Sequence, residues 1–172
     1  YSTTGAINSV IRSKSLTSYF FHLTSGTTNF KNITIDGNNV SAIYGNIFAE
    51  AGTNTNLLTG TTIKNGFTNS SNGLFGAGVR INDGTSYTNN GVLTIDGATI
   101  TNNNSDYGGG LMCSEYAKCY LKSGHIDKNI ATSNGGGVYV APFGILEMTG
   151  GTISENSGDG IHSHGIFTIK GG

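Results

Sequence analysis

The fold is decided by residues 135–156, GGGVYVAPFGILEMTGGTISEN, which form three short runs of β-type residues separated by glycine. Nearly the same phrase occurs one unit earlier, in residues 108–129, as GGGLMCSEYAKCYLKSGHIDKN. A phrase that recurs at a spacing of about 20 to 50 residues is typical of repeat architectures, in which each copy is one structural unit.

The repeat extends over most of the chain when the copies are aligned on one isoleucine each. These isoleucines lie 37, 26 and 27 residues apart: Ile63, Ile100, Ile126 and Ile153. Five residues before each stands another apolar side chain: Leu58, Ile95, Leu121 and Met148. Seven residues before the last three stand Leu93, Cys119 and Leu146, whereas Asn56 breaks the rule in the first copy. This alternation is typical of strands with one buried face.

Each copy also contains a strand that follows a glycine-rich turn. In this strand the first and third residues after the last glycine are expected to face inward. They are Val79 and Ile81, Leu111 and Cys113, Val138 and Val140, and Ile161 and Ser163. One copy cannot bury its apolar face alone, whereas stacked copies form a continuous core with strands about 4.8 Å apart. The sequence therefore predicts an all-β fold, a right-handed parallel β-helix of about six to seven coils with three short strands per coil.

The whole chain, residues 1–172, is expected to form a single β-helix domain. It begins with Tyr1 instead of methionine and stops after FTIKGG without a visible amphipathic cap. Because an open coil exposes apolar core and unpaired edge groups, we expect a fragment of a longer protein or a filament subunit.

Three asparagines lie three residues after the aligned isoleucines: Asn103, Asn129 and Asn156. A left-handed turn residue at this position would let side-chain amides stack from coil to coil, and asparagine is the usual residue other than glycine there. We therefore expect a structural asparagine ladder.

The composition excludes several classes of protein. A formal charge of −1 with only 9 Lys and Arg leaves no basic stripe for a nucleic-acid backbone. No apolar run approaches the roughly 18 residues of a membrane span. With 35% apolar residues the chain can build a core, so it is not a disordered segment.

The glycine-led strand and the Ile-x-x-Asn phrase resemble the repeats of polymorphic outer-membrane proteins and of β-helical surface proteins of bacteria and protists. The hallmark pairs of those repeats are GGA(I/L/V) and FxxN. Their counterparts here are GGGL at 108–111 and GGGV at 135–138, with IxxN at 100–103, 126–129 and 153–156. The resemblance covers residues 93–163 well and the N-terminal third loosely, with isoleucine for phenylalanine and glycine for alanine. It implies an adhesive or structural function at a cell surface.

The two cysteines, Cys113 and Cys119, are both expected to point inward at either end of one turn. A disulfide across this turn would close a short loop, which is worth about 2 to 3 kcal/mol, and would indicate an oxidising, extracytoplasmic location. The alternative is a pair of buried reduced cysteines that pack as small hydrophobes.

The phrase DGIHSHG, residues 159–165, is the most enzyme-like stretch. Because Ile161 faces inward, His162 and His164 project from one outer face about 7 Å apart, with Asp159 nearby. Imidazoles and carboxylates are metal ligands, but polar residues on an outer strand face are more often solvated surface, so no metal or other cofactor is assigned.

The alternative function is that of a carbohydrate-active β-helix with a groove near Arg80, His162 and His164, or of a sugar-binding module. Glycoside cleavage needs two carboxylates that face each other across about 5 to 9.5 Å. The acidic residues are scattered over different faces and turns, so we expect no catalytic residue and no enzyme activity.

Two surface features remain. Asn32, Asn39 and Asn69 begin sequons and are candidate glycosylation sites if the source is eukaryotic. The long interval between Ile63 and Ile100 contains a candidate ligand loop at residues 65–91 with three aromatic residues: Phe67, Phe75 and Tyr87.

Together these patterns predict a non-enzymatic extracellular or cell-surface module that serves as a stalk, fibre subunit or adhesin. The expected partners are other copies of the chain packed end to end, the remainder of a longer chain, and surface glycans.

Overall fold

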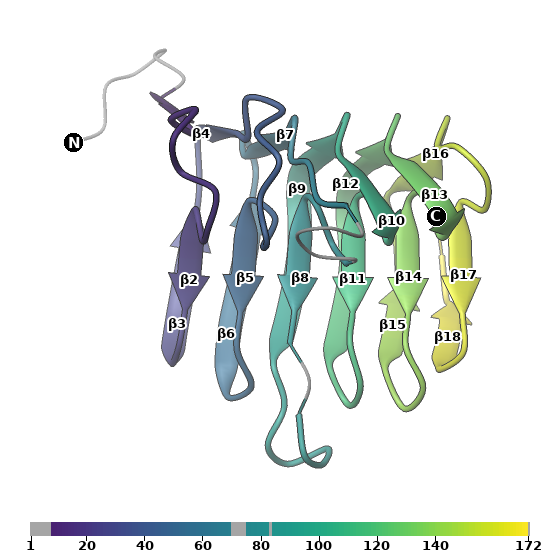
Figure 1. Cartoon of the computed structure of the whole chain (residues 1–172). Helices are drawn as coiled ribbons and strands as arrows, with labels where there is room; N and C mark the ends of the chain where they lie inside the picture. The colour runs from purple at the N-terminus through teal and green to yellow at the C-terminus, as the bar shows by residue number, and fades with distance from the viewer. Residues whose placement is uncertain (1–7, 70–74, 83, 172) are drawn as a thin grey trace.

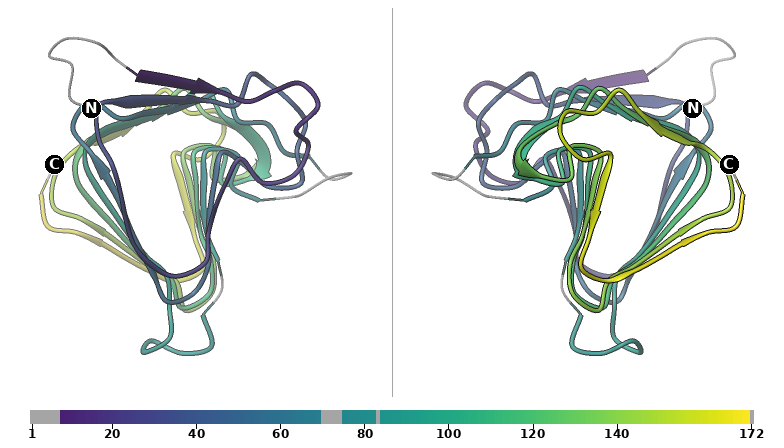
Figure 2. Two further views of the ribbon diagram at one scale, coloured as in Figure 1. Left: turned by 90° about the vertical axis from the view of Figure 1, so that its left-hand side faces the viewer. Right: turned by 90° about the vertical axis from the view of Figure 1, so that its right-hand side faces the viewer.

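The computed structural model describes residues 8–69, 75–82 and 84–171, and within these ranges the chain is entirely β-structure with no helix. It winds as a column of stacked coils with a roughly triangular cross-section (Figures 1 and 2). Seen from the N-terminal end, the chain turns clockwise as it recedes from the viewer, so the helix is right-handed (Figure 2, left). The predicted right-handed parallel β-helix is confirmed, with six coils and three strands per coil.

The strands form three faces, named here in the order in which each coil visits them. The first face contains β1 (Asn8–Ile11), β4 (Ile33–Asp36), β7 (Thr62–Lys64), the C-terminal halves of β9 (Val92–Thr101) and β12 (Lys118–Asp127), and β16 (Thr152–Ser154). The second face contains β2 (Phe21–Leu23), β5 (Ile47–Ala49), β8 (Val79–Ile81), β11 (Leu111–Cys113), β14 (Val138–Val140) and β17 (Ile161–Ser163). The third face contains β3 (Gly26–Phe30), β6 (Thr53–Leu58), the N-terminal halves of β9 and β12, β15 (Ile145–Met148) and β18 (Ile166–Ile169).

The longest turn, residues 65–78, lies between the first and second faces. Two other turns at this corner contain the short strands β10 (Asn104–Tyr107) and β13 (Ile130–Asn134), which pair with each other in parallel. These turns project beyond the triangle on the side of the outer surface of the second face (Figure 2). They therefore overhang that surface.

The core consists of apolar residues that repeat in register from coil to coil. Cys113 pairs with Ile81 and Val140, and Cys119 pairs with Leu93 and Leu146. All of these side chains are buried, as the sequence predicted. In the last coil Ile161 is half-buried and Ser163 is exposed, because in this structure a neighbouring coil covers one side only.

The expected inward position of Leu58 is wrong by one residue. Leu57 is the residue that pairs with Ile95 and is fully buried, whereas Leu58 pairs across a register shift and is half-buried. The inward position before it is filled by buried Thr55 instead of Asn56. The bulge arises because β9 carries an extra residue at the corner between the third and first faces, where two of its residues oppose Leu58.

The glycine triplets allow neighbouring coils to approach closely. Gly135 has a φ of 67°, which other residues rarely adopt. A Cβ at Gly136 would clash with the carbonyl oxygen of Ser157 in the next coil. The GGG phrase thus combines a left-handed turn residue with a position where only hydrogen fits.

The asparagine ladder runs along the corner between the first and second faces. The side-chain Nδ2 of Asn129 donates to the carbonyl oxygen of Ile100 at 2.9 Å. Its Oδ1 accepts from the backbone N–H of Asn103 at 3.0 Å and from the side-chain Nδ2 of the same residue at 2.9 Å. The N–H and Nδ2 of Asn129 in turn donate to Oδ1 of Asn156. Asn103 and Asn129 are fully buried, so the three asparagines pair backbone groups that water cannot reach.

The left-handed residue of this corner is not the ladder asparagine, as expected from the sequence, but the residue before it. Asn102, Lys128 and Glu155 have φ values of 54°, 53° and 55°. The sharp turn at these residues directs the following asparagine into the interior.

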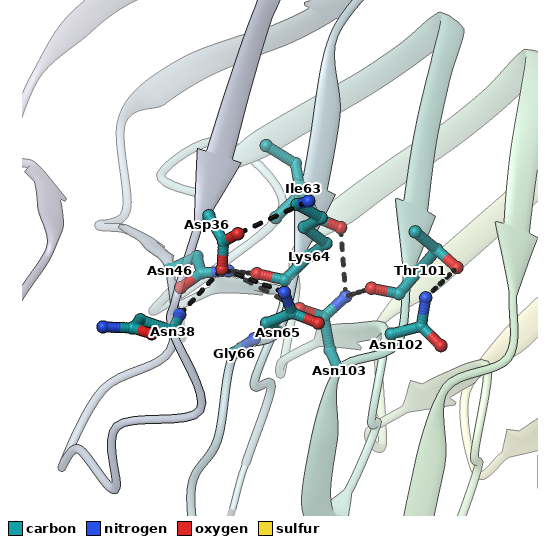
Figure 3. A network of polar contacts seen from close by, with 10 residues as sticks. All are labelled: Asp36, Asn38, Asn46, Ile63, Lys64, Asn65, Gly66, Thr101, Asn102 and Asn103. Carbon is teal, nitrogen blue, oxygen red and sulfur yellow. Dashed lines mark hydrogen bonds and ion pairs between the residues drawn. The ribbon is translucent and has the colours of Figure 1, made fainter. Parts of the chain in front are cut away.

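The ladder continues into the earlier coils through a different residue (Figure 3). Gly66 occupies the ladder position of its coil, and its N–H donates to Oδ1 of Asn103 at 2.9 Å. Buried Asn46, which precedes β5, supplies the missing amide: its Nδ2 donates to the carbonyl oxygen of Lys64 at 2.8 Å and lies 3.5 Å from Oδ1 of Asn103.

Asp36 closes the N-terminal side of this network (Figure 3). Its carboxylate accepts hydrogen bonds from the N–H of Asn38 and the side chain of Asn65 and lies 3.4 Å from Nζ of Lys64. Partial burial raises the pKa of Asp36, but these three contacts outweigh it and hold the pKa below its usual value. The carboxylate is therefore ionised at neutral pH.

Replacing Gly136 with alanine should destabilise the protein far more than replacing Gly158. Gly136→Ala forces neighbouring coils apart, and we expect it to lower the free energy of unfolding by about 3 kcal/mol or more. Gly158 has a φ of 68° but open space around it, so Gly158→Ala should cost only about 1 to 2 kcal/mol of left-handed strain. Urea unfolding of both variants measures the difference, and equal losses would contradict the close-approach explanation.

Replacing Asn129 with alanine should remove a step of the ladder. The change leaves the N–H of Asn103 and the carbonyl of Ile100 buried without this partner, so we expect a loss of about 2 to 4 kcal/mol. Asn56→Ala is the matched control, because Asn56 donates to Asn29 at 2.8 Å in an exposed asparagine pair. It should cost less than about 1 kcal/mol. A comparable loss in both variants would show that burial of the amide is not the cause.

Candidate functional site

The outer surface of the second face carries one residue per coil in a continuous column. The middle residues of its six strands are in register: His22, Phe48, Arg80, Met112, Tyr139 and His162. Because these strands are short and parallel, the side chains stack directly from coil to coil. Aromatic rings from the overhanging turns flank the column on one side.

At the N-terminal end the column is an aromatic stack. Tyr19 lies parallel to His22 at 4.0 Å and to Tyr44 at 4.1 Å between ring centroids, with interplanar angles of 6° in both cases. Phe48 packs against Tyr44 at 4.6 Å in a tilted arrangement. The hydrogen bond with Tyr44 is the main reason why the pKa of Tyr19 is raised, so its phenol is neutral at physiological pH.

In the middle of the column a cavity of about 220 Å³ opens onto the surface. Its described walls are Phe75, Arg80, Met112, Glu115, Tyr139, Ala141 and Pro142. The guanidinium carbon of Arg80 lies 5.4 Å from the ring centroids of both Phe48 and Phe75. Phe75 also packs against Tyr107 at 5.3 Å, and Tyr107 meets Tyr139 edge to face at 5.5 Å.

The cavity thus combines apolar ring faces with a few polar groups. Arg80 supplies a cation and Glu115, which is exposed, supplies a carboxylate. Burial and the neighbouring Tyr107 raise the pKa of Tyr139, so its hydroxyl stays protonated and can donate a hydrogen bond. Aromatic faces beside hydrogen-bonding groups can hold a ring that is apolar on its faces and hydroxylated at its edge.

The three aromatic residues of the expected ligand loop are not brought together. Phe75 lines the cavity, whereas Phe67 is half-buried and pairs with Ser41 and Asn104 at the far end of β10. Tyr87 lies at the opposite corner, between the second and third faces, where it is 41% exposed. Residues 70–74 and 83 of this loop lie outside the described residues.

Tyr87 belongs to a second aromatic row at that corner. It meets Tyr116 edge to face at 5.3 Å, and Tyr116 stacks on Phe143 at 5.1 Å with an interplanar angle of 6°. Tyr116 and Phe143 occupy equivalent turn positions with φ values of 60° and 61°. Tyr87 and Phe143 are exposed, Phe143 at 54%, and Tyr116 is half-buried. None of the three lines the cavity, although Glu115 and Pro142 beside them do.

Asp159, His162 and His164 do come together at the C-terminal end of the second face. Nδ1 of His162 lies 2.7 Å from Oδ2 of Asp159, and Nε2 of His162 lies 3.2 Å from Nε2 of His164. In the part of the chain that the structure describes, no group of three or more His, Cys, Asp or Glu residues is arranged to hold a metal ion.

The two cysteines are buried free thiols in this structure and not the expected disulfide. The thiol of Cys113 lies 3.6 Å from the carbonyl oxygen of Ala117 and 3.4 Å from that of Ile145, both potential hydrogen-bond acceptors. Burial raises the pKa of Cys119 well above its usual value, and its contact with Cys113 raises it further. The pair therefore behaves as the small core hydrophobes that the sequence also allowed.

The sequon asparagines differ in accessibility. Asn32 and Asn39 are exposed at turns, with φ values of 52° and 51°. Asn69 is half-buried with its Nδ2 3.4 Å from Oγ of Ser41, and the rest of its sequon lies outside the described residues. Asn103 also begins a sequon but its amide is buried in the ladder, so the folded chain cannot carry a glycan there.

Sequence reasoning missed Arg12, Asn46 and the cavity ring of Tyr139. Arg12 is buried beneath the first turn, where its guanidinium donates to the carbonyl oxygens of Ser18 at 2.7 Å and Gly45 at 2.6 Å, and burial lowers its pKa to about 10. For Tyr139 a signal was present, because it occupies the outward middle position of a glycine-led strand. Its neighbours Val138 and Val140 point into the core, whereas the outward side chain of Tyr139 forms part of the surface of the second face.

Comparison with protein-family models, curated proteins and solved structures finds no match to this chain. The resemblance to polymorphic outer-membrane proteins therefore stays an expectation based on the repeat phrases. The described residues also contain no helix long and apolar enough to cross a membrane.

The buried thiols should resist alkylation in the native protein. Iodoacetamide reacts with thiolates, and Cys119 is held protonated and inaccessible, so we expect no adduct within the time that exposed thiols react. In urea both cysteines should be modified without a reductant, which mass spectrometry detects as two adducts. Adducts that form only after reduction would show that the thiols are joined as a disulfide.

Proposed function

We propose that this chain is a rigid, non-catalytic module that binds glycans on the outer surface of its second face. The observation that carries the proposal is the cavity of about 220 Å³ between Phe75, Arg80 and Tyr139. Its volume is below the roughly 300 to 1,000 Å³ of pockets that enclose drug-sized ligands. It suits one sugar ring of a longer chain that continues along the column.

The column supplies further contacts on either side of the cavity. The half-buried rings of Tyr19 and Tyr44, which pack over buried Phe48, lie toward the N-terminal end, and His162 lies toward the C-terminal end. Rings that are held in register at each coil are ordered before a ligand arrives, so binding costs little side-chain entropy. This arrangement suits an extended polymer better than a small solute.

Binding without hydrolysis is the better supported form of this function. The common glycosidase mechanisms need two carboxylates across one sugar bond, about 5 to 9.5 Å apart. Glu115 is the one carboxylate among the described residues that line the cavity. A carbohydrate-active enzyme is therefore the second candidate.

The location and assembly that we propose follow from the repeat phrases. Their resemblance to surface β-helices supports an adhesive or stalk-like role outside the cell. End-to-end packing, with a second copy or with the remainder of a longer chain, is supported by an apolar cavity of about 450 Å³ in the last coil. Its walls include Met148, Ile153, Ile161 and Ile169, which a further coil would cover.

Affinity electrophoresis through gels that contain soluble plant, microbial or animal polysaccharides tests the binding proposal. We expect at least one polysaccharide to retard the protein, and Tyr139→Ala and Phe75→Ala each to weaken binding about tenfold, which corresponds to about 1.4 kcal/mol of lost ring contact.

Phe143→Ala is the matched control, because Phe143 is an exposed ring at the other corner, and it should leave binding unchanged. Retardation that depends on Phe143 and not on Tyr139 would move the site away from the cavity. Absence of retardation by every polysaccharide would contradict the proposed function. Release of reducing ends during incubation would favour the enzyme alternative.

A further inference from the structure

At the C-terminal end of the second face, two histidine rings lie with their Nε2 atoms in contact. His162 is the middle residue of β17 and His164 follows two positions later, so both side chains project from the same side of the strand. Their Nε2 atoms are 3.2 Å apart, with ring centroids 4.9 Å apart and an interplanar angle of 64°. His164 is exposed and the side chain of His162 is 30% exposed, so solvent reaches both side chains.

This separation is the one that two ligands of a single metal ion require. Zinc–imidazole bonds are about 2.0 to 2.1 Å long, so two imidazole nitrogens at the tetrahedral angle lie about 3.3 to 3.4 Å apart. The two Nε2 atoms therefore need to move by only a fraction of an ångström to share an ion. Water would supply the remaining ligands.

Asp159 prepares His162 for this role. Its carboxylate oxygen lies 2.7 Å from Nδ1 of His162, and a carboxylate can only accept a hydrogen bond, so Nδ1 carries the hydrogen. Nε2 then carries a lone pair, which accepts a hydrogen bond from Nε2 of His164 in this structure and which a metal ion would take up in place of that hydrogen. A carboxylate behind a coordinating histidine fixes the ring and raises its basicity.

The backbone and the neighbouring ring hold the pair in place. Tyr139 stacks on His162 at 5.6 Å with an interplanar angle of 9°, and the N–H of His164 donates to the carbonyl oxygen of Val140 at 2.8 Å. Both histidines are therefore attached to β14, His162 through its ring and His164 through its backbone, which limits how far the two rings can separate.

We propose that His162 and His164 chelate one divalent transition-metal ion, such as Zn²⁺, Ni²⁺ or Cu²⁺, with Asp159 as a positioning residue. Imidazole nitrogen favours these ions, whereas Ca²⁺ and Mg²⁺ prefer oxygen ligands. The site adjoins the proposed glycan column, because His162 belongs to the column and stacks on Tyr139, but none of its three residues lines the cavity, so metal binding and polysaccharide binding are tested separately.

Isothermal titration calorimetry of the full chain without an affinity tag, with ZnCl₂, NiCl₂ and CaCl₂ as probes, tests the site. We expect one Zn²⁺ or Ni²⁺ per chain and no binding of Ca²⁺. His162→Ala and His164→Ala should each weaken binding at least tenfold, and Asp159→Ala about tenfold.

His125→Ala is the matched control, since His125 is exposed on the first face, where Nδ1 contacts Oγ1 of Thr152 at 2.7 Å. It should leave metal affinity unchanged, and the thermal midpoints of all variants in the absence of metal report whether a substitution acts through stability instead. The proposal is overturned if neither Zn²⁺ nor Ni²⁺ binds, or if binding survives both substitutions of the histidine pair.

Discussion

The turn from the first face to the second depends on buried side-chain amides. At this corner the backbone reverses into the interior, and its N–H and C=O groups lose contact with water. Each such group would cost about 1 to 3 kcal/mol if it were left unpaired. An asparagine side chain has both a donor and an acceptor, so Asn103 and Asn129 each pair with the coil before and the coil after.

That pairing has consequences for the rest of the column. Because each amide spans two coils, it holds their spacing and register at the one corner where the chain makes its longest excursion. The register of the second face follows from it, and the second face is where both proposed sites lie. Because the coils are in register, residues at the same position of successive repeats lie one above the other. Their side chains together form one continuous surface.

The outer column shows how this repetition produces chemistry. Phe75, Met112 and Tyr139 come from three successive coils and together enclose the cavity of the second face. Tyr139 takes part in both sites, since its side chain lines the cavity and its ring also stacks on His162. A ligand on the column and an ion on the histidine pair would therefore be neighbours on the same ordered strands.

Much of this architecture could be predicted from the repeat phrases, and the failures have specific causes. The inward positions of Cys113 and Cys119 followed from alternation, whereas their chemical state did not, because alternation does not give the distance and orientation of the two sulfurs; both are free thiols in this structure. Leu58 was misplaced because an extra residue in β9 shifts the register at a corner. Asn46 was missed because it reaches the ladder from the other end of the turn, outside the Ile-x-x-Asn phrase.

The sequence by itself determined which residues face the core, because alternation along a strand and recurrence between copies are local properties that need no knowledge of neighbouring coils. It also limited the number of coils to about six or seven and placed the asparagines at a turn. Only the tertiary structure decided which outward side chains meet, since turns of unequal length place Phe75 in the cavity and Tyr87 at the opposite corner. Contacts between outward residues depend on register across coils, and that register is a property of the stacked column.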